Sequence, residues 1–145
     1  MQIGIDLGAS KIESVLLDKD GKEHFRERKN SPNNYIETLV SIEKIVTNIE
    51  KKFNSNFNVG LGHPGSTNIK SGLLQNANNS PWMNNKLFQK DISKKLDRTV
   101  YCENDANCFA LSESVDGSAS QHKVVFGVIL GSGCGGGLIV DKKVI

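Results

Sequence analysis

A single long amphipathic run, set among short β-rich runs, most constrains how this chain can fold. From Pro32 onward, apolar residues recur at steps of three and four positions, which is the spacing of one face of an α-helix. The run places a proline in its expected first turn. The members of the stripe are Tyr35, Ile36, Leu39, Ile42, Ile45, Val46, Ile49 and Phe53. One helix of this length among short strands predicts an α/β domain.

The other runs predict the rest of the domain. Residues 2–7, 12–18 and 23–29 are β-rich and separated by turn residues, so we expect three antiparallel strands. A strand over 59–62, a long loop region over 65–85, a helix over 87–96 and a strand over 99–102 follow. A third helix is expected over 105–115, with Cys108, Leu111 and Val115 on its inner stripe. A strand over 123–130 then leads through a glycine cluster into a strand from residue 138, and no internal repeat is expected.

The composition excludes several classes of protein. The chain has 145 residues, of which 37% are hydrophobic and 23% charged, enough for one domain with its own core. Its 18 basic and 16 acidic residues are interspersed, so we expect neither nucleic acid nor a membrane as a partner. Three cysteines without CxxC spacing fit reduced thiols, and no apolar run is long enough to span a bilayer. We therefore expect a cytoplasmic protein.

The segment Asp6-Leu7-Gly8-Ala9-Ser10-Lys11 joins two of the expected strands by a tight turn. Such a turn can aim successive backbone N–H groups at a phosphate, while Ser10 offers a hydroxyl and Lys11 a point charge. A plain hairpin turn is the alternative, since short glycine-bearing hairpins are common. Ala9 would resist a positive φ if the phosphate geometry required one.

A second glycine-rich turn, Gly131-Ser132-Gly133-Cys134-Gly135-Gly136-Gly137, contains the spacing GxGxxG of dinucleotide-binding proteins. That motif opens a helix and is followed about twenty residues later by an acidic residue, whereas this one runs into a strand-like segment. A turn between two strands fits better, with glycines that let phosphate oxygens approach the backbone. A purely structural glycine turn is the alternative.

Two segments in the middle of the chain are candidates for lining a pocket. Gly62-His63-Pro64-Gly65 is a proline turn, and a lone histidine there is more often structural than catalytic, so we assign His63 no proton transfer. Asn76-Ala77-Asn78-Asn79-Ser80-Pro81-Trp82 follows in the long loop region. Trp82 is expected to anchor this loop by packing rather than to stack on a ligand.

The segment Glu103-Asn104-Asp105-Ala106-Asn107 puts a carboxylate and an amide where a strand gives way to a helix. Asn104 is expected to cap the helix, and the backbone N–H groups there favour the negative charge of Asp105. A carboxylate in this place can accept a proton from a bound hydroxyl, and the asparagine amide can donate and accept hydrogen bonds at once. Two capping residues with no further role are the alternative.

In chain order, the segments that begin at Asp6, Gly62, Glu103 and Gly131 resemble the phosphate-, sugar- and base-carrying segments of the ROK family of sugar kinases. The stretch from Glu103 to Glu113 resembles the family's NDANCFALSE stretch nearly residue for residue, and the resemblance covers essentially all 145 residues. It implies a ribonuclease-H-like α/β domain of the actin, hexokinase and Hsp70 superfamily, with a mixed five-stranded sheet and helices on both faces. Residues 1–145 would be the N-terminal domain, and the family's C-terminal domain would be absent from this chain.

The resemblance also implies a set of site residues. Asp105 would be the catalytic base that takes the proton of a sugar hydroxyl as it attacks the γ-phosphate of ATP. Gly65, Asn78 and Asn104 would bind the sugar, and Asp6 would hold magnesium through water. The residues that would bind ATP are Asp6, Gly8, Ser10, Lys11, Gly131, Ser132 and Gly133. The cofactors would be ATP and magnesium, and the zinc site of the family would not be present in this chain.

The resemblance implies one reaction but leaves several candidate sugars. The Asn-Ser-Pro-Trp segment and Val115-Asp116-Gly117 lean toward a fructokinase- or mannokinase-like branch, and an N-acetylglucosamine or N-acetylmannosamine kinase is an alternative. A non-catalytic sugar-binding module or a ROK-type transcription regulator is another. The regulators carry a helix-turn-helix ahead of the sugar-binding core, whereas this chain begins with a strand at Gln2.

The implied second domain bears on activity and assembly. Phosphoryl transfer needs enclosed and aligned substrates, so we expect little or no kinase activity from this chain alone. Uncovered apolar surface predicts association with the missing domain, with a second chain or with copies of itself as a homo-oligomer.

Overall fold

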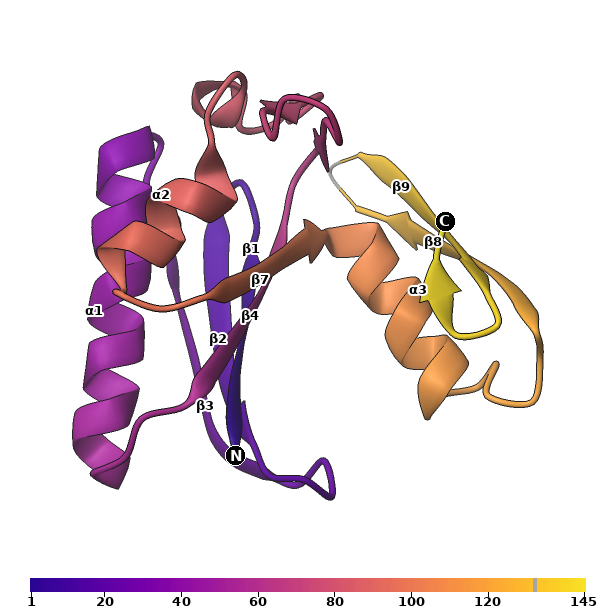
Figure 1. Cartoon of the computed structure of the whole chain (residues 1–145), viewed down its shortest axis with the longest axis horizontal. Coiled ribbons are helices and arrows are strands. Elements are labelled where there is room, and N and C mark those ends of the chain that lie inside the picture. Colours follow the sequence, from indigo (N-terminus) through magenta and orange to yellow (C-terminus); the bar gives the residue numbers. More distant parts are fainter. Residues whose placement is uncertain (132) are drawn as a thin grey trace. The chain divides into compact units, whose positions relative to one another are not determined.

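The computed structural model describes residues 1–131 and 133–145 (Figure 1). The chain forms two compact units, Met1–Cys102 and Glu103–Ile145. We expected one domain over residues 1–145, and whether the two units act as one domain stays a prediction.

A mixed five-stranded sheet forms the centre of the first unit, as the family resemblance implied. Its strands are β1 (Gln2–Leu7), β2 (Lys11–Leu17), β3 (Glu23–Asn30), β4 (Asn58–His63) and β7 (Val100–Asn104), in the spatial order β3-β2-β1-β4-β7. Strand β1 pairs antiparallel with β2 and parallel with β4. Because side chains alternate along a strand, Ile3, Ile5 and Leu7 share one face of β1, where they are buried.

Helices α1 (Tyr35–Phe53) and α2 (Phe88–Lys95) lie on the same face of this sheet (Figure 1). Asn34 caps α1, because its side chain accepts hydrogen bonds from the N–H groups of Ile36 and Glu37. Pro32 therefore lies before the helix rather than in its first turn. The predicted stripe is confirmed over most of its length, and its buried apolar members are Leu39, Ile42, Ile45, Val46 and Ile49.

The long loop region between β4 and α2 contains short elements that the sequence did not predict. These are β5 (Ser66–Thr67), β6 (Leu74–Gln75) and the 3₁₀ helix η1 (Pro81–Met83). Leu74 and Met83 are buried, and Trp82 packs against the core while partly buried. Trp82 thus anchors the loop, as expected.

The second unit consists of one helix, α3 (Asp105–Val115), packed on an antiparallel sheet of β8 (Val124–Leu130), β9 (Cys134–Val140) and β10 (Lys143–Val144). The strand order is β10-β9-β8. Strand β9 begins at Cys134, four positions earlier than the sequence suggested. Three glycines of the cluster, Gly135, Gly136 and Gly137, therefore belong to a strand and not to a turn.

These glycines explain why the predicted inner stripe of α3 is wrong. The buried residues of the helix are Ala106, Ala110 and Ser114, whereas Val115 is exposed. A Cβ atom on Gly137 would lie 2.6 Å from the Ala106 carbonyl oxygen, and one on Gly127 would lie 2.6 Å from the Ala110 Cβ. The helix approaches the sheet so closely that only small side chains fit between them.

The hairpin β8–β9 repeats the hairpin β1–β2, although no repeat was expected from the sequence. Five residues recur at one constant spacing: Gly4, Leu7, Gly8, Asp18 and Lys19 match Gly127, Leu130, Gly131, Asp141 and Lys142. The strand pairing is shifted by one residue: Ile3 lies opposite Leu16, whereas Phe126 lies opposite Leu138 and not opposite Ile139, the residue that corresponds to Leu16. Leu7 pairs with Ile12 but Leu130 pairs with Cys134, so the second connection is one residue shorter. Most of the matched positions are turn or glycine positions, which is why the repeat is faint in the sequence.

Candidate active site

In the first unit, the predicted site residues gather where β1 and β4 end. These two strands run parallel, so their carboxyl ends lie at the same edge of the sheet. Asp6 lies beside Gly62 in the pairing register and is exposed. Ligands of open α/β sheets bind at the carboxyl ends of the strands. The two segments singled out in the sequence thus meet at the expected edge.

The turn from Gly8 to Lys11 is closed by backbone hydrogen bonds. The Gly8 N–H donates to the Lys11 carbonyl oxygen at 2.9 Å, and the Ser31 N–H donates to the Ser10 carbonyl oxygen at 2.9 Å. Among the described residues, those with positive φ do not include Ala9, so alanine is compatible with this turn. The Lys11 ammonium donates to the Asn30 side-chain oxygen.

Gly65 occupies a position that only glycine can fill. Its φ is +77°, and a Cβ there would lie 2.3 Å from the Gln75 carbonyl oxygen and 2.8 Å from the Ala77 nitrogen. This close approach sets Gly65 against the segment that carries Asn78. Asn78 is exposed, and its N–H donates to the Asn76 carbonyl oxygen at 3.0 Å. Two predicted sugar-binding residues are therefore neighbours.

His63 is a buried packing residue, in agreement with the structural role expected for it. Its ring meets the Phe88 ring edge-on, with centroids 5.8 Å apart. Nδ1 lies 3.1 Å from the Pro64 carbonyl oxygen, and since a carbonyl only accepts, Nδ1 donates. The side chain is 1% exposed, so it supports the loop that carries Gly65 from within the core.

In the second unit, Asn104 and Asp105 form the beginning of α3. The Asn104 side-chain oxygen accepts a hydrogen bond from the Asn107 N–H at 3.2 Å, which confirms Asn104 as the N-cap. The Asp105 Oδ1 accepts from the Ala106 N–H at 2.8 Å and from the Asn104 Nδ2 at 2.9 Å. Among the described residues, none donates to the Asp105 Oδ2. Two donors thus fix the carboxylate through Oδ1.

Two further residues that the sequence did not single out hold this helix end. The Glu103 Oε1 accepts from the Asn104 N–H at 2.8 Å and from the Asn107 Nδ2 at 3.0 Å. Glu103 and Asn107 are four residues apart, the spacing at which side chains meet along a helix, and that spacing was the available signal. These hydrogen bonds stabilise the backbone that carries Asp105.

The second glycine turn lies at the same end of the second unit as Asp105. The Gly131 N–H donates to the Gly133 carbonyl oxygen at 2.9 Å and closes the turn, while Ser132 lies outside the described residues. A Cβ on Gly135 would lie 3.1 Å from the Ala106 Cβ, so the first residues of β9 contact the first turn of α3. Asp105, Gly131 and Gly133 therefore belong to one end of this unit.

The predicted site residues thus fall into two groups. The first unit carries Asp6, Gly8, Ser10, Lys11, Gly65 and Asn78, and the second unit carries Asn104, Asp105, Gly131 and Gly133. Each group is assembled within its own unit.

The acidic side chains can be compared with the ligands that a metal ion requires. Over residues 1–131 and 133–145, no group of three or more His, Cys, Asp or Glu side chains is placed to hold a metal. Mg²⁺ usually keeps several waters and takes one or two carboxylates together with substrate phosphates. A single exposed carboxylate at Asp6 fits that donor set, whereas it does not fit a cage made of protein ligands alone.

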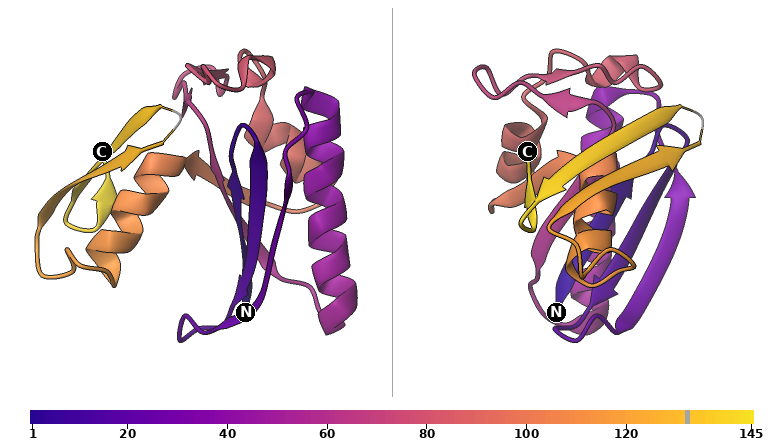
Figure 2. Two further views of the ribbon diagram at one scale, coloured as in Figure 1. Left: turned by 180° about the vertical axis from the view of Figure 1, so that it is seen from behind. Right: turned by 90° about the vertical axis from the view of Figure 1, so that its right-hand side faces the viewer.

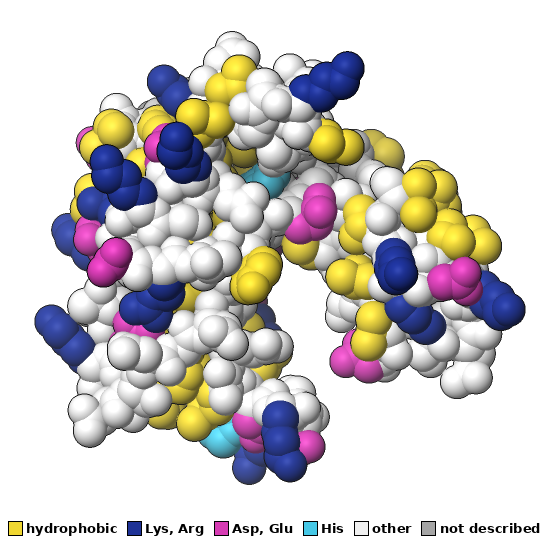
Figure 3. Space-filling model, in the orientation of Figure 1, with side chains coloured by type: hydrophobic (Ala, Val, Ile, Leu, Met, Phe, Trp, Pro, Cys, Tyr) yellow, Lys and Arg dark blue, Asp and Glu magenta, His cyan; other side chains and the backbone are white. Residues whose placement is uncertain are grey.

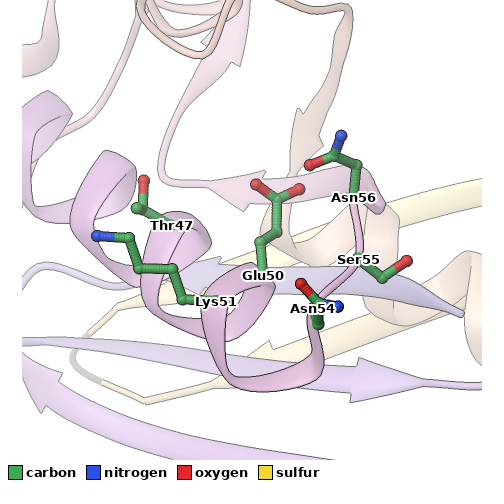
Figure 4. Close-up of a pocket in the computed structure, with 6 residues that line it drawn as sticks. All are labelled: Thr47, Glu50, Lys51, Asn54, Ser55 and Asn56. Atoms are coloured by element: carbon green, nitrogen blue, oxygen red, sulfur yellow. The ribbon is translucent and has the colours of Figure 1, made fainter.

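A polar hollow of about 400 Å³ lies at the C-terminal end of α1 (Figure 4). It is lined by Thr47, Glu50, Lys51, Asn54, Ser55 and Asn56. None of these is a predicted site residue, so the hollow is not the candidate active site. Among the described residues, no helix is long and apolar enough to cross a membrane.

Comparisons with known proteins agree on one family. The model of the ROK family matches residues 2–145. An N-acetyl-D-glucosamine kinase of Histophilus somni (strain 129Pt) is 41% identical over 145 residues, which are 99% of this chain and 47% of the relative. One of Citrobacter koseri is 37% identical over 146 residues, covering 100% of this chain and 48% of the relative.

Solved structures give the same result. A ROK family glucokinase from Streptomyces griseus, in complex with glucose and AMPPNP, aligns with a TM-score of 0.87 and 26% identity, over 99% of this chain and 46% of that one. The fold expected from the resemblance, that of the actin and hexokinase superfamily, is thereby confirmed. The chain spans about half the length of the relatives it matches. A family model that covers almost every residue shows that this chain belongs to the ROK family.

Proposed function

We propose that this chain carries sugar-binding and phosphate-binding residues of an ATP-dependent sugar kinase. The family, the relatives named N-acetyl-D-glucosamine kinase and the neighbour bound to glucose and AMPPNP support this proposal. The reaction would transfer the γ-phosphate of ATP to a sugar hydroxyl. Because the chain spans about half of its relatives, we expect the activity to require the other half.

The carboxylate of Asp105 is the observation that carries the proposal. A sugar hydroxyl is too weak an acid to ionise at neutral pH, so a base must take its proton as it attacks. Asp105 stands at the N-terminus of α3, where the helix dipole favours its negative charge. Two donors hold Oδ1 and orient the carboxylate, which leaves Oδ2 as the oxygen that would accept the proton.

The neighbouring groups have matching roles in the proposal. The Asn104 amide, beside the carboxylate, would bind an adjacent sugar hydroxyl, and Gly65 and Asn78 would contact the sugar from the first unit. The backbone of the two glycine turns, with Ser10 and Lys11, would bind the phosphates. Asp6 would hold magnesium through water, and that ion would neutralise charge on the phosphates.

The relatives favour N-acetyl-D-glucosamine as the sugar. The sequence leaned toward a fructokinase-like substrate, but the two relatives described above are both named N-acetyl-D-glucosamine kinase. We therefore place N-acetyl-D-glucosamine first and fructose second among the candidate substrates.

A chimera tests the proposed function. This chain would replace the matched segment of the Histophilus somni kinase, and phosphorylation of N-acetyl-D-glucosamine, glucose, mannose and fructose would be measured by ADP release. We expect activity with N-acetyl-D-glucosamine. Asp105→Asn should lower kcat by about 10² to 10⁴, the usual contribution of a general base, with little change in the KM for ATP.

Asp116→Asn is the matched control, since Asp116 ends the same helix at its other terminus. It should leave kcat within about twofold of the unchanged chimera. A folded chimera that phosphorylates none of the four sugars, or one in which Asp105→Asn is as active as Asp116→Asn, would overturn the proposed function.

A further inference from the structure

His63 is a buried titratable side chain to which the proposed function gives no part. It is the last residue of β4 and is 1% exposed. The loop that follows carries Gly65, and Figure 2 (left) shows the region between β4 and α2 at one end of the first unit's sheet. Inside a protein a polar ring nitrogen without a hydrogen-bond partner is costly. The partners of the His63 ring therefore indicate which part of the loop the ring holds.

Both nitrogens of the ring contact the loop that carries Gly65. The His63 Nδ1 donates to the Pro64 carbonyl oxygen at 3.1 Å. In a neutral imidazole whose Nδ1 donates, Nε2 is an acceptor. The Thr67 Oγ1 lies 3.5 Å from Nε2, so the Thr67 hydroxyl donates to it. One ring thus contacts the residues on both sides of the dipeptide 65–66.

This dipeptide is packed in turn against the segment that carries Asn78. Thr67 belongs to β5, which pairs antiparallel with β6. The Gly65 backbone lies so close to the Gln75 carbonyl oxygen and the Ala77 nitrogen that a Cβ would not fit between them. Ala77 is fully buried, so the segment cannot retreat toward solvent without opening the core. A shift of Thr67 would therefore disturb both predicted sugar contacts, Gly65 and Asn78.

Helix α2 fixes the orientation of the His63 ring. Phe88, its first residue, is 2% exposed, and its ring meets the imidazole edge-on with centroids 5.8 Å apart. The Phe88 ring also meets the Tyr35 ring, and the Tyr35 hydroxyl donates to the Asp91 Oδ2 at 2.6 Å, which joins α1 to α2. Figure 3 shows Lys and Arg side chains on the outer surface over α1 and α2. The apolar side of α2 therefore encloses the imidazole, in the orientation that makes both hydrogen bonds.

We propose that His63 is a positioning residue for sugar binding: through Pro64 and Thr67 it holds the backbone of Gly65 in the place where the sugar binds. This inference rests on the proposed function and adds to it a buried residue that touches neither the sugar nor ATP. An apolar side chain of similar size would fill the same space but would make neither hydrogen bond. The hydrogen bonds of the ring, and not its volume alone, should therefore set the affinity for the sugar.

Steady-state kinetics of the chimera described above test the proposal. His63→Leu keeps a side chain of comparable size in the core and removes both hydrogen bonds. It should raise the KM for the sugar by about tenfold or more, because the loop that binds the sugar is then less well positioned. The KM for ATP should stay within about twofold, since the phosphates are bound by other segments. A variant that was merely less stable would not separate the two substrates in this way.

Thr67→Val removes one of the two hydrogen bonds from an exposed position, so it decides the matter if circular dichroism shows that His63→Leu does not fold. It should raise the KM for the sugar by about three- to tenfold, the range expected for one hydrogen bond. Thr47→Val is the matched control, since it makes the same chemical change in the hollow at the C-terminal end of α1. It should leave both KM values unchanged.

Amide hydrogen exchange of the substrate-free chimera measures the positioning without any kinase activity. Exchange over residues 65–67 and 75–77 should be about tenfold faster in His63→Leu, and also faster in Thr67→Val, while β1 and β2 exchange at the same rate. Unchanged exchange in both variants would overturn the inference whatever the activity. An active chimera with the same KM for the sugar in Thr67→Val and Thr47→Val would also overturn it, and would leave the proposed function standing. Inactivity of the unchanged chimera on all four sugars would instead overturn the proposed function.

Discussion

The hairpins β1–β2 and β8–β9 are both antiparallel and share residues at five positions, but helices pack on opposite faces of them. In the first unit α1 covers the face that holds Ile3, Ile5 and Leu7 with large aliphatic side chains. In the second unit α3 packs on the other face, against Gly127, Gly135 and Gly137. A shared hairpin therefore does not fix which of its faces becomes the core, because the side chains on the two faces decide it.

The difference also separates two ways of stabilising a helix on a sheet. The core of the first unit relies on the transfer of large apolar surface out of water. The contact in the second unit relies on close approach, with backbone against backbone and alanine against glycine. The first kind tolerates modest changes in volume, whereas the second does not tolerate an added carbon atom.

Matched truncations at equivalent positions give the largest expected difference. Ile5 is 4% exposed and its counterpart Val128 is 45% exposed. Ile5→Ala should lower the free energy of unfolding by about 2–5 kcal/mol, because it leaves a cavity, whereas Val128→Ala should cost less than about 1 kcal/mol. Urea denaturation followed by circular dichroism measures both. Equal losses at the two positions would contradict the difference in burial.

Adding a methyl group should destabilise the second unit more than the first. Gly137→Ala places a Cβ against the Ala106 carbonyl oxygen and should lower the free energy of unfolding of the second unit by about 1–3 kcal/mol. Gly60→Ala in β4 meets no atom within 4 Å and serves as the control, with no loss expected. Amide hydrogen exchange resolved by NMR would assign each effect to its unit. The contact described for α3 would be wrong if Gly137→Ala were silent.

The first unit contains a polar contact that should matter less than its apolar core. Arg98 donates through Nη2 to the Glu50 Oε2 at 3.1 Å and through Nη1 to the Phe57 carbonyl oxygen at 3.0 Å. Arg98→Ala leaves the largely buried Glu50 carboxylate without this partner and should cost about 1–2 kcal/mol. The more exposed pair Lys95–Glu43, 2.9 Å apart, is the control, and Lys95→Ala should cost less than about 0.5 kcal/mol. Thermal unfolding of both variants would reveal whether the ranking holds.

The smallest effect concerns the turn that follows the hairpin β1–β2. The hydrogen bond from His24, at 2.7 Å, lowers the pKa of Asp18 below its ordinary value of 3.8, and the N–H groups of Lys22 and Asp20 add to the effect. Because the folded pKa is lowered, the stabilisation is present above pH 3.8 and is lost as the pH falls through the lowered pKa. His24→Ala should raise the pKa of Asp18 toward 3.8 in an NMR titration of the carboxyl carbon. An unchanged titration would show that His24 does not set it.

Much of the first unit could be predicted from the sequence because its core follows the spacing of apolar residues. The strands β1, β2 and β4 and the helices α1 and α2 have buried apolar side chains at the period of each element. The buried face of α3 could not be predicted in this way. Its partner surface is made of glycines, which contribute no hydrophobic signal, so the larger residues were wrongly placed inside.

The candidate site could likewise be predicted only in part from the sequence. The residue types of Asn104 and Asp105 and their place at a helix end followed from the sequence. The orientation of the carboxylate did not, because it depends on which oxygen the Ala106 N–H and the Asn104 amide contact. The bracing by Glu103 and Asn107 likewise depends on rotamers that spacing alone leaves open.

The contact of Gly127 and Gly137 with α3 limits how this chain can vary. If Ala106 or Ala110 became larger, no compensating change would exist across the contact, since glycine has no smaller substitute. The helix itself would have to shift, and Asp105, its first residue, would shift with it. The eleven residues of α3 therefore determine both which substitutions the contact tolerates and how the carboxylate of the proposed base is oriented.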